Sequence, residues 1–223
     1  MSQYMPAVKR YRPDQINQFR AARFSIVRGL IADILSSQPE CSVIDIGGTL
    51  EYWRTLGADL DWSRVKVRLV NLTAGSNDFA GVTSEVGDAR RMPQFADRSF
   101  DLVHSNSVIE HVGRWGDMAS MASEVRRLAP RYFVQTPYFW FPIEPHARFP
   151  LLHWMPESWR YRILMRRTCG FWQQQPDLGR AVAAIQSAVI VDKAQLRYLF
   201  PDAKISFERY YGLPKSLMAI KQG

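Results

Sequence analysis

Along the first 136 residues, segments with apolar residues at helical spacing alternate with short apolar runs typical of strands. Residues 16–35 carry an apolar stripe at helical spacing with arginines on its flanks, and they predict a helix within 13–37. Short apolar or alternating runs then end at Gly, Asp, Asn or Pro, and these runs predict strands. They cover residues 41–46, 65–72, 82–86, 99–105 and 131–136. A helix with Asp117 as its N-cap is predicted over 117–128. Strands and helices in this order predict a parallel sheet with helices on both faces.

The pattern changes after residue 137. Residues 138–190 mix aromatic and basic side chains without a clear period, and we interpret them as an insertion. A capping-box sequence at 192–195 then predicts a helix ending at Phe200. Residues 205–211 and 216–220 read as two strands joined through Gly212, Leu213 and Pro214. The chain therefore ends in a predicted antiparallel hairpin.

Length and composition fit a single domain over residues 1–223. Hydrophobic residues make up 47% and charged residues 22% of the chain, which is typical of a globular protein. Residues 1–12 are polar and basic and predict a flexible tail. Cys41 and Cys169 make no disulfide framework or metal motif, which favours a reducing compartment. No signal-peptide core or membrane-spanning run is evident, so we expect a cytoplasmic protein.

The formal net charge of +8 and the sequence pI of about 9.7 are unusual. A basic surface favours anionic partners, which include nucleic acid, anionic lipid headgroups and phosphorylated small molecules. The charge alone does not select among these classes. A basic protein without any functional patch is the simpler interpretation.

Chemically informative residues stand where the predicted strands end. In a parallel sheet the carboxyl ends of the strands lie at one edge, where ligands bind. Gly47 and Gly48 allow a sharp turn and a close approach of the backbone to a ligand. The residues at these ends are Asp45, Gly47, Gly48, Asn71, Asp88, Ala89 and the stretch 105–111. Singly, Asn71 and Asp88 are also ordinary turn residues.

Taken in order, these residues resemble the class I S-adenosylmethionine-dependent methyltransferases over about residues 41–136, and in particular methyltransferase type 11. Asp45 and Gly47 match the acid and the first glycine of the family's Asp/Glu-x-Gly-x-Gly-x-Gly loop. Thr49 and Glu51 replace the other two glycines. The resemblance implies a Rossmann-like, seven-stranded, mostly parallel sheet with a C-terminal antiparallel hairpin. It also implies S-adenosyl-L-methionine as cofactor. The Gly-x-Gly-x-x-Gly pattern of nicotinamide-dependent dehydrogenases is absent.

The resemblance assigns cofactor contacts to individual residues. Asn71 stands where the family has an acid for the ribose hydroxyls, and an asparagine hydrogen-bonds a diol without charge assistance. Asp88, followed by Ala89, stands at the position for the adenine amino group. Residues 104–107, with Ser105 and Asn106 among them, would flank the methionine end. Together with Asp45, Gly47 and Gly48 these are the predicted cofactor residues.

One phrase resembles the ubiquinone-type O-methyltransferases, in which Glu-x-x-Glu-His can bind a divalent metal. Here the phrase is Ser107-Val108-Ile109-Glu110-His111, so one carboxylate is missing. Two remaining groups rarely hold a hard cation such as Mg²⁺ without further ligands. We therefore predict no metal.

Methyl transfer to a hydroxyl requires a group that takes the proton. His104, His111, and the acid and histidine of the segment 142–146 are candidates, and we predict His111 and His146 as the catalytic residues. A structural histidine in a proline-rich turn is an equal alternative for His146.

The insertion 138–190 is the predicted acceptor-recognition segment. The first hypothesis is O-methylation of a small molecule or a lipid-linked glycan, with peripheral contact of its aromatic and basic side chains at an anionic inner membrane face. A satellite core with a solvated rim is the structural alternative. An RNA methyltransferase and a catalytically inactive cofactor-binding regulatory protein are the other functional hypotheses. The sequence gives no indication of oligomeric state.

Overall fold

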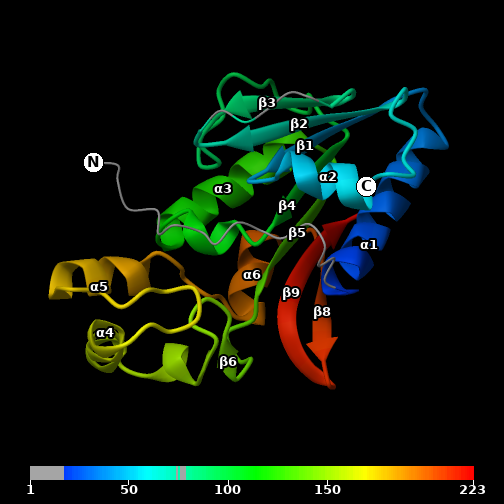
Figure 1. The fold of residues 1–223 in the computed structure, drawn as a ribbon. Coiled ribbons are helices and arrows are strands. Elements are labelled where there is room, and N and C mark those ends of the chain that lie inside the picture. Colours follow the sequence, from blue (N-terminus) through cyan, green and yellow to red (C-terminus); the bar gives the residue numbers. More distant parts are fainter. Residues whose placement is uncertain (1–17, 74, 76–78) are drawn as a thin grey trace.

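The computed structural model describes residues 18–73, 75 and 79–223. At its centre is a seven-stranded sheet with the order β3-β2-β1-β4-β5-β9-β8 (Figure 1). The strands are β1 (Cys41–Ile46), β2 (Val65–Asn71), β3 (Val82–Val86), β4 (Leu102–Asn106), β5 (Arg131–Pro137), β8 (Lys204–Tyr210) and β9 (Leu213–Lys221). Strands β1 to β5 pair in parallel, whereas β9 runs antiparallel to both β5 and β8. This confirms the predicted fold class.

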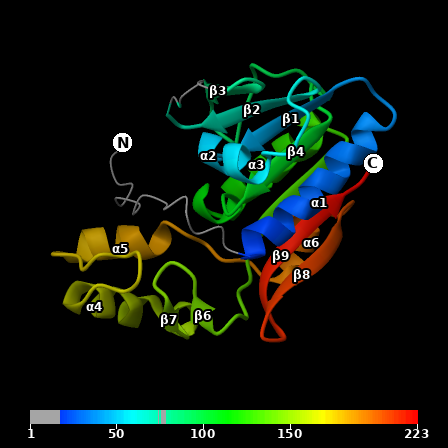
Figure 2. The same ribbon diagram turned by 45° about the vertical axis from the view of Figure 1, so that its right-hand side comes forward.

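Helices cover both faces of the sheet (Figures 1 and 2). Helices α1 (Gln18–Leu35) and α2 (Leu50–Leu56) pack on one face, and α3 (Trp115–Leu128) and α6 (Lys193–Leu199) on the other. Successive residues of a strand point to opposite faces, so Val43 of β1 joins the α1 core while Ile44 joins the α3 core. Because both faces are covered, the central strands are apolar on both sides.

Several predicted boundaries move in the structure. Helix α3 begins at Trp115, and the Asp117 carboxylate accepts the backbone N–H of Arg114 at 3.0 Å, so the prediction of Asp117 as N-cap was wrong. The turn of the C-terminal hairpin is shorter than predicted, with Gly212 at a φ of +81°. Asp192 caps α6 with Gln195 as predicted. The predicted tail 1–12 and the helix start at 13–17 lie outside the described residues.

Residues 138–190 form a lobe beside the carboxyl edge of the sheet, at the lower left of Figure 1. It contains β6 (Ile143–Glu144), β7 (Phe149–Pro150), the 3-10 turn η2 (Leu152–Trp154), α4 (Glu157–Arg166) and α5 (Leu178–Gln186). The lobe has its own core, which includes Leu152, Leu164, Cys169, Trp172 and Ile185. Other aromatic side chains remain exposed, among them Trp140, Trp154, Trp159 and Phe171. The insertion is thus a satellite core with an aromatic surface.

Asp202 follows α6 and ties it to the sheet. Its carboxylate accepts hydrogen bonds from Tyr132 Oη at 2.6 Å and Lys221 Nζ at 2.8 Å, and Arg126 Nε lies 3.1 Å away. Burial by itself raises the pKa of Asp202, but the bonds from Lys221 and Tyr132 outweigh it and lower the pKa to about 2. The ionised form therefore stabilises the fold.

We expect Asp202→Asn to lower the free energy of unfolding at pH 7 by about 1–2 kcal/mol. Because the folded pKa lies below the unfolded value, this contribution is complete above about pH 4 and is lost as the pH falls toward 2. Urea unfolding at pH 7, 4 and 3 measures it. A difference as large at pH 3 as at pH 7 would contradict the assignment. Asp97→Asn, at a carboxylate that is 77% exposed, is the control and should change stability by less than about 0.5 kcal/mol.

Candidate functional site

The register of the parallel strands brings the predicted cofactor residues to one edge of the sheet. Ile46 at the end of β1 pairs with Val70 of β2 and Ser105 of β4. Asn71 pairs in turn with Val86, at the end of β3. The segments that follow these residues therefore leave the sheet side by side.

Gly47 and Gly48 form the loop after β1. Gly47 has a φ of +75°, and its N–H donates to the Val70 carbonyl at 2.8 Å. The Asn71 Nδ2 atom donates to the Gly48 carbonyl at 2.9 Å, so Asn71 holds the loop from the neighbouring strand. Thr49 caps α2 by accepting the Tyr52 N–H at 3.3 Å, which explains a threonine where the resembling family has glycine. The loop exposes backbone at the start of a helix.

The Asp45 carboxylate lies beneath this loop and is fully buried. Trp53 Nε1 donates to its Oδ2 atom at 2.6 Å, and His104 Nδ1 lies 2.7 Å from its Oδ1 atom. The His104 ring stacks on Phe133 and is only 1% exposed, so it is not accessible to an acceptor. His104 is therefore removed from the candidate bases. Neither Trp53 nor the pairing of His104 with Asp45 carries a signal in the sequence.

Asp88 and Ala89 follow β3. Arg90 binds the Asp88 carboxylate with Nη2 at 2.6 Å and Nε at 3.0 Å, and also contacts Asp117 at 3.1 Å. The hydrogen bonds from Arg90 hold the pKa of Asp88 below its usual value. Ala89 is buried in the core. Any adenine contact of Asp88 would therefore be shared with Arg90.

Ser105 and Asn106 end β4 and are held by hydrogen bonds with Ile46 and Arg23. Ser105 is buried and donates to the Ile46 carbonyl at 3.3 Å. Asn106 Oδ1 accepts a hydrogen bond from Arg23 Nη1 at 2.6 Å. The same nitrogen donates to Gln135 Oε1 at 2.6 Å, and Arg23 Nε lies 3.1 Å from Glu208 Oε1. In the sequence Arg23 is one of several arginines flanking the helical stripe, so nothing distinguished it.

The structure brings together the two predicted catalytic histidines, which are far apart in the sequence. His146 Nε2 lies 3.2 Å from His111 Nε2. His146 Nδ1 contacts Glu144 Oε1 at 2.7 Å, and His111 Nδ1 contacts the Ser187 carbonyl at 2.9 Å. Burial lowers the pKa of His146, but the hydrogen bond and charge of Glu144 outweigh it, so the net shift is upward. His111 is the exposed member of the pair and His146 is half-buried.

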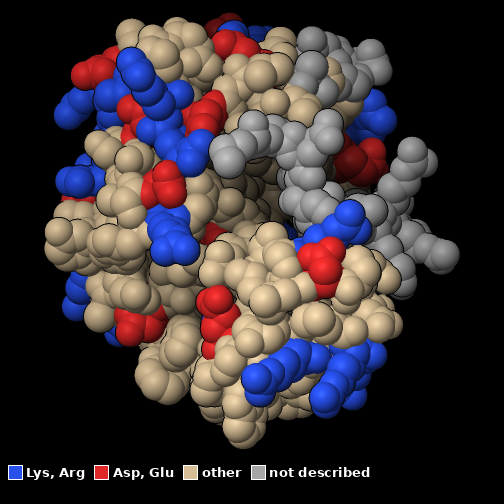
Figure 3. Space-filling view, turned by 90° about the vertical axis from the view of Figure 1, so that its left-hand side faces the viewer, with Lys and Arg blue, Asp and Glu red and all other residues tan. Residues whose placement is uncertain are grey.

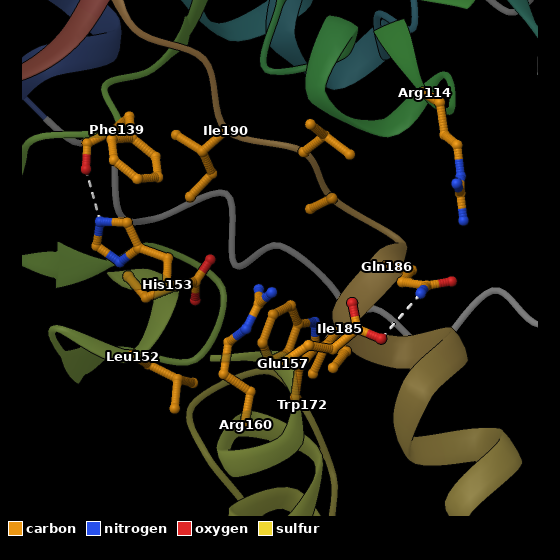
Figure 4. Close-up of a pocket in the computed structure, with 13 residues that line it drawn as sticks. Arg114, Phe139, Leu152, His153, Glu157, Arg160, Trp172, Ile185, Gln186 and Ile190 are labelled. Carbon is orange, nitrogen blue, oxygen red and sulfur yellow. Dashed lines mark hydrogen bonds between the residues drawn. The ribbon is translucent and has the colours of Figure 1, made fainter. Parts of the chain in front are cut away.

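A pocket of about 340 Å³ lies beside His146, between the lobe and the start of α3. Its wall includes Glu144 and Trp172, and the ring of Trp172 is stacked on that of His146 at 6.0 Å. Figure 4 shows Arg160 and Glu157 reaching into the pocket from α4 and Arg114 extending toward it from the start of α3. The remaining lining residues are Phe139, Leu152, His153, Ile185, Gln186, Ala188, Val189 and Ile190. Sequence reasoning located the insertion and the acid Glu144, but it did not single out Arg114, Glu157 or Gln186.

Basic side chains are dispersed on the face shown in Figure 3. Lys and Arg lie around its edges with Asp and Glu among them, and uncharged residues fill much of the centre. Among the described residues, this face presents no continuous basic track for a nucleic-acid backbone. Among the same residues, no helix is both long and apolar enough to cross a bilayer.

Residues 47–130 match the family model of a methyltransferase domain. No curated protein matches the sequence. Solved structures with a similar fold include magnesium protoporphyrin IX methyltransferase (ChlM) from Synechocystis PCC 6803 with bound SAH, which is 15% identical. The structural match covers 93% of this chain and 89% of the ChlM chain, with a TM-score of 0.51.

Two further structures are similar. The PH0226 protein from Pyrococcus horikoshii OT3 is 16% identical, and the match covers 92% of each chain with a TM-score of 0.51. A protein from Rhodobacter sphaeroides described as a putative Zn-dependent alcohol dehydrogenase is 12% identical. The match covers 92% of this chain and 98% of that protein, with a TM-score of 0.54. At these identities the similarity concerns the fold.

The matched domain begins at the loop after β1 and extends through α3, and it contains all the predicted cofactor residues except Asp45. Together with the strand order, the match identifies a methyltransferase domain in this part of the chain. The match to a methyltransferase domain supports S-adenosyl-L-methionine as the cofactor.

Proposed function

We propose that the protein transfers the methyl group of S-adenosylmethionine to a hydroxyl oxygen of a small molecule or glycan bound in the pocket beside His146. The observation that carries this proposal is the contact between His146 and His111. His111 follows β4 and His146 belongs to the lobe, and Glu144 and Trp172, which both contact His146, are members of the pocket wall.

Methyl transfer is an in-line displacement in which the bond between carbon and the sulfonium sulfur breaks as the bond between carbon and oxygen forms. S-adenosylhomocysteine leaves as the neutral thioether, and the hydroxyl proton needs an acceptor. The proposed acceptor is the histidine pair, because Glu144 orients His146 and stabilises its charged form. The lobe excludes water and holds the acceptor in line.

The composition of the pocket supports a polyol acceptor. Trp172 and Phe139 offer faces on which a sugar ring can stack, while Arg160, Arg114 and Glu157 offer hydrogen-bonding groups around them. A volume of about 340 Å³ is at the lower end of the range for small-molecule sites. One ring with its substituents fits better than an extended polymer. The exposed Trp140, Trp154 and Trp159 on the same lobe favour an acceptor that is attached to a lipid.

For the cofactor we propose the contacts that the resemblance assigns. The backbone at Gly47 and Gly48 would approach the cofactor, with Asn71 at the ribose, Asp88 and Ala89 at the adenine, and Ser105 and Asn106 at the methionine end. Asp45 would act from below by fixing the loop through Trp53 and His104. Isothermal titration with S-adenosylhomocysteine tests the foundation of this proposal.

His146→Gln is expected to reduce the rate of methyl transfer by about 10²–10⁴-fold, the usual contribution of a general base. Its affinity for S-adenosylhomocysteine should stay within about twofold, because the cofactor residues lie on the sheet. Release of S-adenosylhomocysteine can be followed with nucleotide sugars, polyprenyl-phosphate sugars, catechols and a structured RNA as acceptors. Turnover with a hydroxyl acceptor, and greater turnover with its lipid-linked form, is the expected result.

A matched variant is Tyr198→Phe, at a side chain that is 73% exposed on α6, and it should be fully active. If RNA is the only acceptor that is methylated, the proposed small-molecule or glycan acceptor is wrong. Cofactor binding without turnover on any acceptor would favour the regulatory alternative. An unchanged rate in His146→Gln would remove the histidine pair from the mechanism.

A further inference from the structure

We propose that Glu110, His111 and His146 form a binding site for a divalent transition metal of the Zn²⁺ type. One ligand atom from each of the three residues lies within 4.8 Å of the others. Glu110 and His111 belong to the turn η1 (Ile109–His111) after β4, whereas His146 comes from the lobe. The site therefore joins the sheet to the insertion.

The hydrogen bonds of the two histidines fix which nitrogen is available. The Ser187 carbonyl can only accept, so His111 Nδ1 carries the hydrogen and Nε2 has a free lone pair. Glu144 accepts from His146 Nδ1 in the same way. With Glu144 ionised, two Nε2 lone pairs thus face each other at 3.2 Å, an arrangement that a proton or a metal ion between them would stabilise.

The separation fits a metal ion. With Zn–N bonds of about 2.0–2.1 Å and tetrahedral angles, two ligating nitrogens lie about 3.3 Å apart. The observed 3.2 Å between the two Nε2 atoms is close to this value. A shared proton also fits this distance, so the third residue decides between the two.

Glu110 supplies that third group. Its side chain is 1% exposed, and Oε1 has no hydrogen-bond partner among the described residues. The other oxygen, Oε2, accepts a hydrogen bond from Thr136 Oγ1 at 3.0 Å, which orients the carboxylate. A buried carboxylate oxygen without a partner is costly. A metal held by His111 and His146 would satisfy it.

The surrounding contacts are those expected around metal ligands. Metal-binding histidines usually donate their second nitrogen to a carboxylate or a carbonyl, as His146 does to Glu144 and His111 to Ser187. The Val189 N–H also donates to the Glu110 carbonyl at 2.7 Å and holds the turn against the lobe. Two imidazoles with one carboxylate suit Zn²⁺, Co²⁺ or Fe²⁺ better than Mg²⁺.

This proposal departs from the sequence expectation of no metal, because the insertion, and not position 107, supplies the third ligand. It also refines the proposed function on which it rests. With a metal bound, the Nε2 lone pairs would be used for coordination. The two histidines would then hold the ion instead of taking the proton, and the ion would lower the pKa of the acceptor hydroxyl so that its proton can pass to water.

The test uses the full chain, expressed without a histidine tag and stripped with a chelator. Titration with Zn²⁺ should show one site with a dissociation constant of micromolar or lower, and Mg²⁺ at the same concentrations should not compete. Co²⁺ should give the visible absorption of a four- or five-coordinate site. His111→Gln, at an exposed side chain that is expected to leave the fold intact, should weaken Zn²⁺ binding by 100-fold or more.

Glu144→Gln should weaken Zn²⁺ binding by about 10–100-fold through the orientation of His146. His153→Gln, at the remaining histidine of the lobe, is the matched control and should leave it unchanged. Equal Zn²⁺ affinity in wild type and His111→Gln, or no micromolar site, would overturn the proposal and leave a proton between the histidines. Because metal binding is measured without acceptor or cofactor, its failure is separate from a failure of methyl transfer.

Discussion

Gly48→Ala is expected to weaken S-adenosylhomocysteine binding by about 100-fold or more. A Cβ atom at this position would overlap the Asp45 carboxylate, which is fully buried and fixed by Trp53 and His104. Because that carboxylate is buried and held by contacts with Trp53 and His104, the loop backbone is expected to shift away from its present position. A shift of about 1 Å removes the close approach that the proposed cofactor contact needs.

Isothermal titration measures the loss of affinity, and thermal unfolding measures the accompanying destabilisation. Gly29→Ala is the matched control, since the added methyl group on α1 would meet no atom within 4 Å apart from the neighbouring residues and backbone of its own helix. This variant should bind S-adenosylhomocysteine normally and gain up to about 1 kcal/mol of stability from helix propensity. If Gly48→Ala binds like the wild type, the loop after β1 is not the cofactor loop.

Arg23→Met is expected to lower the free energy of unfolding by about 3–5 kcal/mol. The substitution keeps an apolar stem but leaves Glu208, whose side chain is only 8% exposed, without its cation. It also removes the donor shared by Asn106 and Gln135 at 2.6 Å each. Since α1, β4, β5 and β8 meet at this guanidinium, their packing depends on it.

Urea unfolding at pH 7 tests this prediction. Adding Glu208→Gln to Arg23→Met should recover part of the lost stability, because the second substitution removes the unpaired buried charge. Arg28 lies on the same helix as Arg23 and forms an exposed ion pair with Asp59. Arg28→Met should therefore lower the free energy of unfolding by less than about 1 kcal/mol. A loss in Arg23→Met no larger than in Arg28→Met would show that the buried network adds little.

The sequence was sufficient for the fold because its signals are local. Alternating or continuous apolar runs that end in glycine, asparagine or proline can only be short strands between helices, and the order of elements then selects a parallel sheet. The boundaries were less certain, as Asp117 shows. An aspartate suits both the N-cap and the third position of a helix, and only the observed bond to the Arg114 N–H distinguishes the two.

In the candidate site, too, some positions follow from the sequence and others only from the tertiary structure. The sequence by itself determined which segments end at the carboxyl edge of the sheet, and hence where Gly47, Asn71 and Asn106 lie, because strand period and strand order suffice for that. Tertiary structure alone decided that Asp45 and His104 pair beneath the loop. It also decided that His146, from an insertion without a regular period, meets His111 and Glu110. Contacts between residues distant in the sequence depend on packing and chain path, and one sequence carries no local signal for them.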